Sequence, residues 1–283
     1  MSERFAIAPY FDDLLARLEA GDATSRAAYG RHVHWGWWPD PAAATGTAED
    51  YGAAAERMCH LVCDAAGIRD GMHVLDVGCG FGGTIASLND RFHNLDLLGV
   101  NIDPRQVKRA QDTIQPVNGN RIRFEVGDAC NLQVPATAFD AALAVECIFH
   151  FESRAAFFAG VSKALKPGGR LMVSDFVPTP DALPLLEKNN AGTDDATRTS
   201  YGKVDLLCTE ERYRSMADAV GLRLDDARDI TAGTLPTYAF MRGLLPQWTD
   251  KQAARAHGRA SNRLELACES GWLKYTVLTF TRV

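Results

Sequence analysis

Residues 74–84, which read VLDVGCGFGGT, constrain the fold of this chain more than any other stretch. An apolar run of strand character enters a glycine-rich turn and continues into a helix. Glycine suits a turn whose backbone conformation a Cβ would obstruct, or where a ligand approaches the main chain. Gly78, Gly80 and Gly83 also fit the dinucleotide pattern G-x-G-x-x-G, which has low specificity on its own. The stretch predicts a strand, a turn and a helix, with a ligand held over the turn.

Short apolar runs alternate with amphipathic helices after this point. The predicted strands are residues 73–77, 95–101, 122–126, 139–145, 170–176, 222–230 and 272–283. Such alternation is typical of parallel strands joined by crossover helices. The sequence therefore predicts an α/β fold with a doubly wound, mostly parallel sheet of seven strands.

Four segments make up the predicted organisation. Residues 1–70 read as helical, interrupted by an aromatic stretch at 34–39, and residues 71–176 form the ligand-binding core. Residues 177–208 are a polar insertion after the fifth strand, which we expect to form a lid together with the N-terminal segment. Residues 209–283 complete the core with the last two strands, and Thr209 is a plausible N-cap of the helix that follows it.

Composition and charge exclude several classes of function. The 283 residues are 46% hydrophobic and carry a net charge of −6 with a pI of about 5.7, which leaves no electrostatic footprint for nucleic acid. No apolar run reaches the ~18–20 residues of a membrane-spanning helix, and the first residues do not read as a signal peptide. Seven scattered cysteines favour reduced thiols in the cytoplasm.

Three polar residues at strand ends separate two interpretations of the glycine turn. Asp76 lies two residues before Gly78, where it could receive an amino group of a ligand or order the loop. Asn101 follows the second strand, where a nicotinamide enzyme favours an acid for the ribose. Asp128 ends the third strand, where it could accept a hydrogen bond from an adenine amino group. A turn-forming Asp128 and a purely structural glycine turn are the simpler alternatives.

Four motifs occur in register over residues 70–176. They are LDVGCG at 75–80, GDA at 127–129, FD at 139–140 and LKPGGRL at 165–171. In order and spacing they resemble the successive motifs of class I S-adenosylmethionine-dependent methyltransferases. HWGWW at 34–38, NIDPRQ at 101–106 and the insertion after SDF at 174–176 resemble a narrower group. It contains sterol and tocopherol C-methyltransferases, the rebeccamycin sugar O-methyltransferase and the cyclopropane fatty acid synthases.

The resemblance implies a set of residues that bind S-adenosylmethionine. They are Trp37, Asp76, Gly78, Gly80, Asn101, Ile102, Gln106, Asp128, Ala129 and Glu146. Within this set Asn101 and Gln106 would hold ribose hydroxyls, and Glu146 would lie near the methionine end. Trp37 stands where the narrower group usually has tyrosine, which puts a hydroxyl contact to the cofactor in doubt.

Two residues are candidates for moving a proton. His150 follows the fourth strand and Asp175 ends the fifth, so both lie at the sheet edge where ligands bind. In sugar O-methyltransferases of the group, a histidine and an aspartate at matching positions are linked to proton removal. We therefore expect His150 to act as general base and Asp175 to orient or assist it. A packing role for His150 and a turn-capping role for Asp175 are the alternatives.

The resulting prediction is an enzyme that transfers a methyl group to a small organic acceptor without a metal. The favoured reaction is O-methylation of a natural product, sugar or isoprenoid, and C- or N-methylation is the alternative. Cyclopropane synthase chemistry would use aromatic faces to stabilise a carbocation, but residues 149–150 do not reproduce the full segment those enzymes carry. A nicotinamide-dependent oxidoreductase and a non-catalytic module that binds the cofactor remain as alternatives of other classes.

Overall fold

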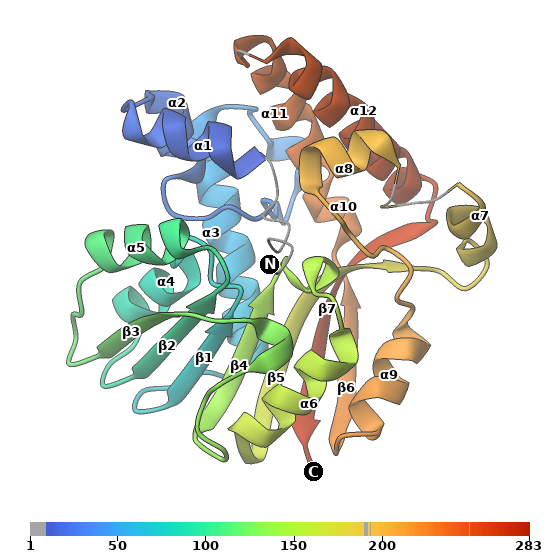
Figure 1. Cartoon of the computed structure of the whole chain (residues 1–283). Coiled ribbons are helices and arrows are strands. Elements are labelled where there is room, and N and C mark those ends of the chain that lie inside the picture. Colours follow the sequence, from blue (N-terminus) through green and yellow to red (C-terminus); the bar gives the residue numbers. More distant parts are fainter. Residues whose placement is uncertain (1–9, 190–191, 193, 249) are drawn as a thin grey trace, which may run out of the picture.

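The computed structural model describes residues 10–189, 192, 194–248 and 250–283. Seven strands form a single sheet in the order β3-β2-β1-β4-β5-β7-β6 (Figure 1). The strands are β1 (His73–Val77), β2 (Asp96–Asn101), β3 (Arg121–Val126), β4 (Phe139–Val145), β5 (Leu165–Pro178), β6 (Leu222–Asp229) and β7 (Leu273–Arg282). β7 runs antiparallel to β5 and β6, whereas the other described strand pairs are parallel. The predicted doubly wound, mostly parallel sheet is confirmed.

The strand order reverses at β1, which pairs with β2 on one side and β4 on the other. At such a point the crossover connections leave in opposite directions, and a crevice opens beyond the carboxyl ends of the strands. The glycine turn follows β1 directly, and Glu146 follows β4. The topology therefore places both segments at the mouth of one crevice.

Helices cover both faces of the sheet because its central strands, such as β1 and β4, are buried on both sides. One face is covered by α3 (Ala48–Ala65), α4 (Gly83–Arg91) and α5 (Pro104–Thr113), and the other by α6 (Arg154–Ala164) and α9 (Glu210–Asp218). The predicted N-cap of α9 is confirmed, since the Thr209 hydroxyl accepts a hydrogen bond from the Arg212 N–H.

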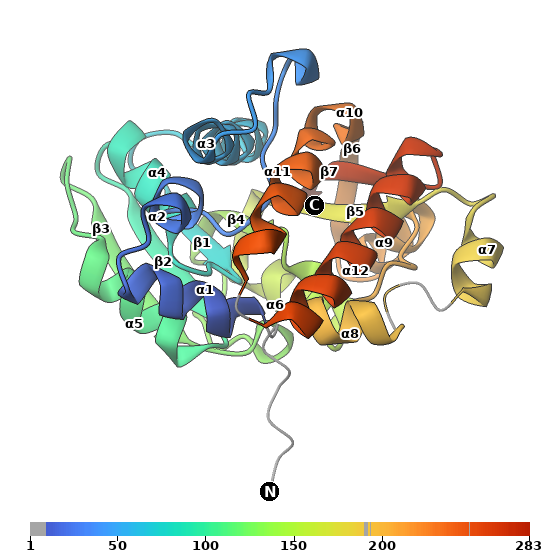
Figure 2. The same ribbon diagram turned by 90° about the horizontal axis from the view of Figure 1, so that it is seen from above.

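Another group of helices lies over the carboxyl ends of the strands (Figure 2). It comprises α1 (Tyr10–Glu19), α2 (Ala23–Tyr29), α7 (Leu183–Lys188), α8 (Asp195–Tyr201), α10 (Thr231–Thr234), α11 (Pro236–Leu244) and α12 (Lys251–Glu269). The sequence led us to expect the N-terminal segment and the insertion here. It did not lead us to expect α11 and α12, which add a third component, with α12 packed beside α8.

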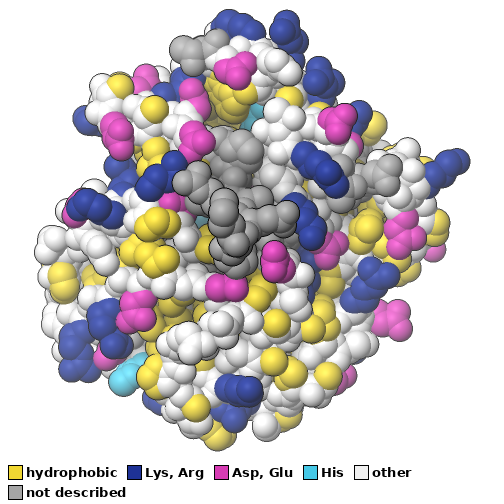
Figure 3. Space-filling model, in the orientation of Figure 1, with side chains coloured by type: hydrophobic (Ala, Val, Ile, Leu, Met, Phe, Trp, Pro, Cys, Tyr) yellow, Lys and Arg dark blue, Asp and Glu magenta, His cyan; other side chains and the backbone are white. Residues whose placement is uncertain are grey.

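Short 3-10 helices complete the connections: η1 (Pro41–Ala43), η2 (Ala129–Asn131), η3 (Ile148–His150) and η4 (Leu245–Gln247). Among the described residues, no helix combines the length and the apolar character needed to cross a membrane. Basic and acidic side chains are intermixed over the face seen in Figure 3.

Candidate functional site

Two adjoining cavities open at the carboxyl ends of the strands. The glycine-loop cavity is bounded by the turn after β1 together with Asn101 and Asp128. The aromatic cavity lies under the overlying helices and is walled mainly by apolar and aromatic side chains, among them Trp35, Phe149, Phe176, Tyr201 and Trp248. Glu146 and His150 line both cavities. A ligand in either cavity therefore meets the same two side chains.

The glycine turn brings the main chain close to its neighbours. Gly78 and Gly80 have φ values of +75° and +54°, which side chains other than glycine rarely adopt. A Cβ at Gly78 would lie 2.6 Å from the Sγ of Cys147. Both glycines line the glycine-loop cavity, so a ligand there can approach the backbone directly.

Asp76 contributes a buried carboxylate to the same cavity. It is 1% exposed, and its Oδ2 has no hydrogen-bond partner among the described residues. Burial raises the pKa of this carboxyl to about 7. Since an unpaired buried carboxylate is costly, the site is suited to a ligand that supplies a cationic donor, such as an ammonium group.

A polar cluster lies at the end of β2. Asn101 donates through Nδ2 to the Oε1 of Gln106 at 3.1 Å, and both are buried. Asp103 is 1% exposed and pairs with Arg105 at 2.8 Å, which holds the pKa of the aspartate below its usual range. These contacts orient the amides of Asn101 and Gln106 at the cavity wall, where they can bind ligand hydroxyls. Ile102 lies beside them and is 37% exposed.

Asp128 and Ala129 line the far wall of the glycine-loop cavity. The Asp128 Oδ1 accepts a hydrogen bond of 2.8 Å from the N–H of Cys130 and caps η2. The turn-forming role that the sequence left open is therefore present. Because the residue also lies in the cavity wall, capping and ligand binding are compatible.

Glu146 occupies a strained position after β4. Its φ of +51° lies in the left-handed region, where residues other than glycine are uncommon and often mark functional sites. Its Oε2 accepts hydrogen bonds from the Trp35 N–H at 2.9 Å and the Tyr275 hydroxyl at 2.5 Å. Burial raises the pKa of Glu146 to about 8. Neither Trp35 nor Tyr275 belongs to the set of site residues predicted from the sequence.

His150 ends η3 at the junction of the two cavities. Its Nδ1 lies 3.3 Å from the carbonyl oxygen of Lys203. A carbonyl can only accept, so this hydrogen bond requires a proton on Nδ1 and leaves the lone pair on Nε2. Burial lowers the pKa of His150 to about 4, so the ring is neutral at physiological pH.

Asp175 lies away from His150, which corrects the expectation that it orients the base. Neighbouring residues of a strand point to opposite faces: Phe176 lines the aromatic cavity, and Asp175 points towards α6 and α9. There its Oδ2 accepts from the Arg154 Nη2 at 3.0 Å and from the Tyr213 hydroxyl. Arg154 also pairs with Asp205, so the cluster ties the end of the insertion to the core.

Trp37 also lies outside the walls of both cavities, contrary to the cofactor contact that we expected. Its backbone N–H donates to the carbonyl of Ala54 at 2.9 Å. A Cβ at Gly233 would lie only 2.4 Å from its indole Nε1. The indole thus packs against α10, while the neighbouring Trp35 faces the aromatic cavity.

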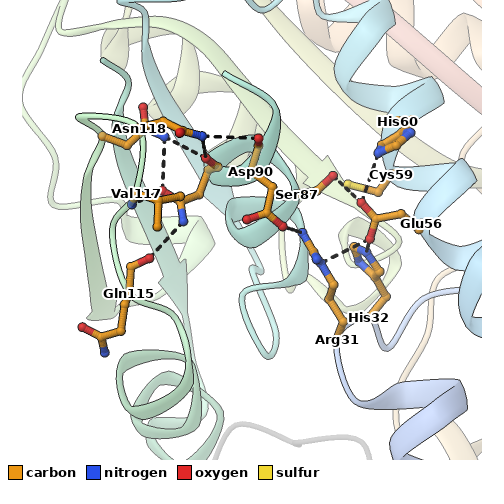
Figure 4. Close-up of polar contacts among 12 residues, drawn as sticks. Arg31, His32, Glu56, Cys59, His60, Ser87, Asp90, Gln115, Val117 and Asn118 are labelled. Atoms are coloured by element: carbon orange, nitrogen blue, oxygen red, sulfur yellow. Dashed lines mark hydrogen bonds and ion pairs between the residues drawn. The ribbon is translucent and has the colours of Figure 1, made fainter. Parts of the chain in front are cut away.

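A partly buried polar network fixes the N-terminal segment above the glycine turn (Figure 4). The Nε2 of His32 lies 2.7 Å from Glu56 Oε2, and the hydroxyl of Ser87 donates to Glu56 Oε1 at 2.5 Å. Arg31 pairs with Asp90 at 2.8 Å. Since Arg31 and His32 line the glycine-loop cavity, α3 and α4 hold part of its roof in place.

Comparison with known proteins agrees with this geometry. A family model described as a methyltransferase domain matches residues 74–169. An O-methyltransferase from Pyrenophora dematioidea is 35% identical over 74% of this chain and 74% of its own length. The 27-O-demethylrifamycin SV methyltransferase of Amycolatopsis mediterranei is 30% identical over 95% of this chain and 93% of its own.

The fold has a counterpart among solved structures. The crystal structure of the [4+2]-cyclase SpnF superposes with a TM-score of 0.76 at 23% identity, covering 97% of this chain and 95% of that one. This likeness concerns the fold alone, whereas the two relatives share sequence over most of both chains. The glycine turn, the strand order and these relatives together show that the chain is an enzyme of the class I S-adenosylmethionine-dependent methyltransferases.

Proposed function

We propose that this enzyme methylates an oxygen atom of a small, natural-product-type molecule, with His150 as general base. The observation that carries the proposal is that Glu146 and His150 line both cavities at once. A cofactor in the glycine-loop cavity and an acceptor in the aromatic cavity would therefore meet beside His150. Relatives named as O-methyltransferases support oxygen as the accepting atom.

The residues of the glycine-loop cavity fit S-adenosylmethionine. The unpaired carboxylate of Asp76 would pair with the methionine ammonium, and the backbone at Gly78 and Gly80 would lie against the methionine and ribose. Asn101 and Gln106 would bind the ribose hydroxyls. Ile102, Asp128 and Ala129 would surround the adenine. When bound, the cofactor supplies an electrophilic methyl group. The thioether left behind is neutral, so its departure from the methyl group needs no acid.

His150 would take up the proton that the acceptor hydroxyl loses as its oxygen forms the new bond to carbon. The Lys203 carbonyl fixes the hydrogen on Nδ1, so Nε2 receives this proton. The low pKa of the ring keeps it in the accepting form at neutral pH and lets it return the proton to water. A general base of this kind typically contributes a rate factor of ~10²–10⁴.

The aromatic cavity would position the acceptor and exclude water. Trp35, Phe149 and Phe176 form apolar walls next to the shared residues. Much of the rate enhancement of a direct methyl transfer comes from holding the two reactants at attacking distance. An apolar wall also removes competing water from the reaction.

Three measurements test the proposal. Isothermal titration should show micromolar binding of S-adenosylhomocysteine and none of NADH. With an acceptor found by screening phenols and alcohols, His150→Ala should lower kcat by about 10²–10⁴-fold, and mass spectrometry should find an O-methyl product. His93→Ala is the matched control, because His93 is a 61% exposed surface side chain. Full turnover by His150→Ala, or an N- or C-methyl product, contradicts the proposal.

A further inference from the structure

His257 lies in α12 with one ring nitrogen unpaired. The side chain is 5% exposed and lines the aromatic cavity. Its Nδ1 has no hydrogen-bond partner within the described parts of the chain. A buried polar atom without a hydrogen-bond partner destabilises the folded state. The apolar side chains of the cavity cannot supply that partner.

The imidazole of His257 packs between two aromatic side chains in the cavity wall. The aromatic rings of Tyr201 and Trp248 each lie 5.0 Å from the imidazole, centroid to centroid. The Tyr201 hydroxyl lies 3.5 Å from Nε2 of His257 and 3.0 Å from the hydroxyl of Ser261. The Tyr201 hydroxyl thus contacts the ring at Nε2, while Nδ1 stays unpaired among the described residues.

His257 belongs to a different wall from the reacting groups. His150 and Glu146 lie where the two cavities meet, whereas His257 lines the aromatic cavity alone, on the side formed by α8 and α12. Arg17 and Asp13 also line this cavity, but they pair with each other: the Nε of Arg17 lies 2.6 Å from the Oδ2 of Asp13. An acceptor long enough to span the aromatic cavity would therefore meet His150 with one part of its frame and the wall at His257 with another.

We propose that His257 Nδ1 is a specificity-determining anchor, which forms a hydrogen bond to a second hydroxyl or carbonyl group of a largely apolar acceptor. The inference rests on the proposed function, because it takes the aromatic cavity as the acceptor site. It identifies the substrate class as a molecule with two oxygen functions on an apolar skeleton. One function is methylated beside His150, and the other is bound at α12.

Fluorine NMR titrations with 6-fluoro-2-naphthol and 2-fluoronaphthalene test the anchor without requiring turnover. Both are carried out on the full chain with saturating S-adenosylhomocysteine. The wild type should bind the naphthol about five- to tenfold more tightly, as expected for one net hydrogen bond in a buried site. His257→Leu should bring this ratio close to one, and the near-isosteric His257→Asn should keep a clear preference for the naphthol.

Several results would overturn the anchor. They are equal binding of both probes by the wild type, no binding of either, or a preference that survives in His257→Leu. A preference removed by His150→Leu but not by His257→Leu would assign the contact to His150 and also refute the inference.

The ¹⁵N shift of Nδ1 in the wild type should move on addition of the naphthol, which makes the test independent of how the variants fold. Loss of S-adenosylhomocysteine binding in the same samples would instead count against the proposed function.

Discussion

The backbone N–H of Trp35 donates a hydrogen bond of 2.9 Å to the carboxyl group of Glu146. The same oxygen also accepts from the Tyr275 hydroxyl on β7. One buried side chain thus joins the N-terminal segment, the loop after β4 and β7 at the junction of the two cavities. The protonation state of Glu146 therefore decides which substitutions at this position keep the free energy of unfolding unchanged.

Glu146→Gln should be tolerated at neutral pH. Because burial raises the pKa of Glu146 to about 8, the carboxyl group is protonated at pH 7, and an amide replaces it with similar shape and charge. We expect an unfolding free energy near that of the wild type. Glu146→Leu should lose about 1–3 kcal/mol, because the Trp35 N–H loses its acceptor and the Tyr275 hydroxyl keeps only its 3.4 Å contact with Ser174 Oγ. Urea denaturation measures both variants.

The sign of the pH dependence follows from the raised pKa. In the unfolded chain Glu146 ionises near its ordinary value of 4.5, but in the folded chain only near 8. Stability that is fully present below about pH 4.5 is therefore lost as pH rises towards 8. Glu146→Gln should lack this loss, so the wild type should fall behind it over that range. A parallel pH course for the two proteins would refute the assignment.

Asp76 should make cofactor binding pH-dependent. The carboxylate must be ionised to pair with an ammonium group, and without a ligand its pKa is about 7. The Kd for S-adenosylhomocysteine should rise as pH falls below 7, approaching about tenfold per pH unit. Asp76→Asn should bind about 10–100-fold more weakly at pH 8 and show no such slope in isothermal titration. Asp70→Asn, at a 62% exposed carboxylate, should behave like the wild type.

His150 should leave an unusual signature in the rate profile. With cofactor saturating, kcat should stay flat as pH falls from about 8 to 5, because the ring is protonated only near pH 4. Below that value the lone pair on Nε2 is lost and the rate should decline. An acid limb near pH 6.5, the ordinary pKa of histidine, would show that burial does not act on this ring as described.

Asp175 should prove structural. Asp175→Asn removes the buried counter-charge of Arg154 and should cost about 3 kcal/mol of unfolding free energy, seen as a lower Tm. The pH profile of kcat should keep its shape. Asp225→Asn, at a surface pair with Arg223, is the control and should cost less than about 1 kcal/mol. An unchanged Tm with a displaced pH profile would restore the catalytic role expected from the sequence.

The strands could be predicted closely because buried parallel strands are short apolar runs between glycine-rich turns and helix caps. The expected limits of β1 and β4 coincide with the observed ones. The residues around the glycine turn were likewise predictable, since motif order places Asp76, Asn101 and Asp128 at the ends of adjacent strands. All three line one cavity.

Side-chain direction and long-range packing were harder to predict. The positions of Asp175 and Trp37 depend on which face of an extended segment each occupies. Asp175 is buried and Trp37 half-buried, both against elements that no local pattern identifies. The contact between Tyr201 and His257 joins residues 56 positions apart in sequence. Such a contact arises only when α8 and α12 pack together, so sequence periodicity carried no signal for the position of His257 or for α11 and α12 among the overlying helices.

The position of β7 has a consequence for how the enzyme is made. β7 lies between β5 and β6, and its Tyr275 supplies the hydroxyl bound to Glu146. During synthesis β6 therefore waits without a neighbour until residues 273–282 have left the ribosome. Because β7 joins β6 to the rest of the sheet and carries the hydroxyl bound to Glu146, the junction of the cavities is complete only once these residues have paired.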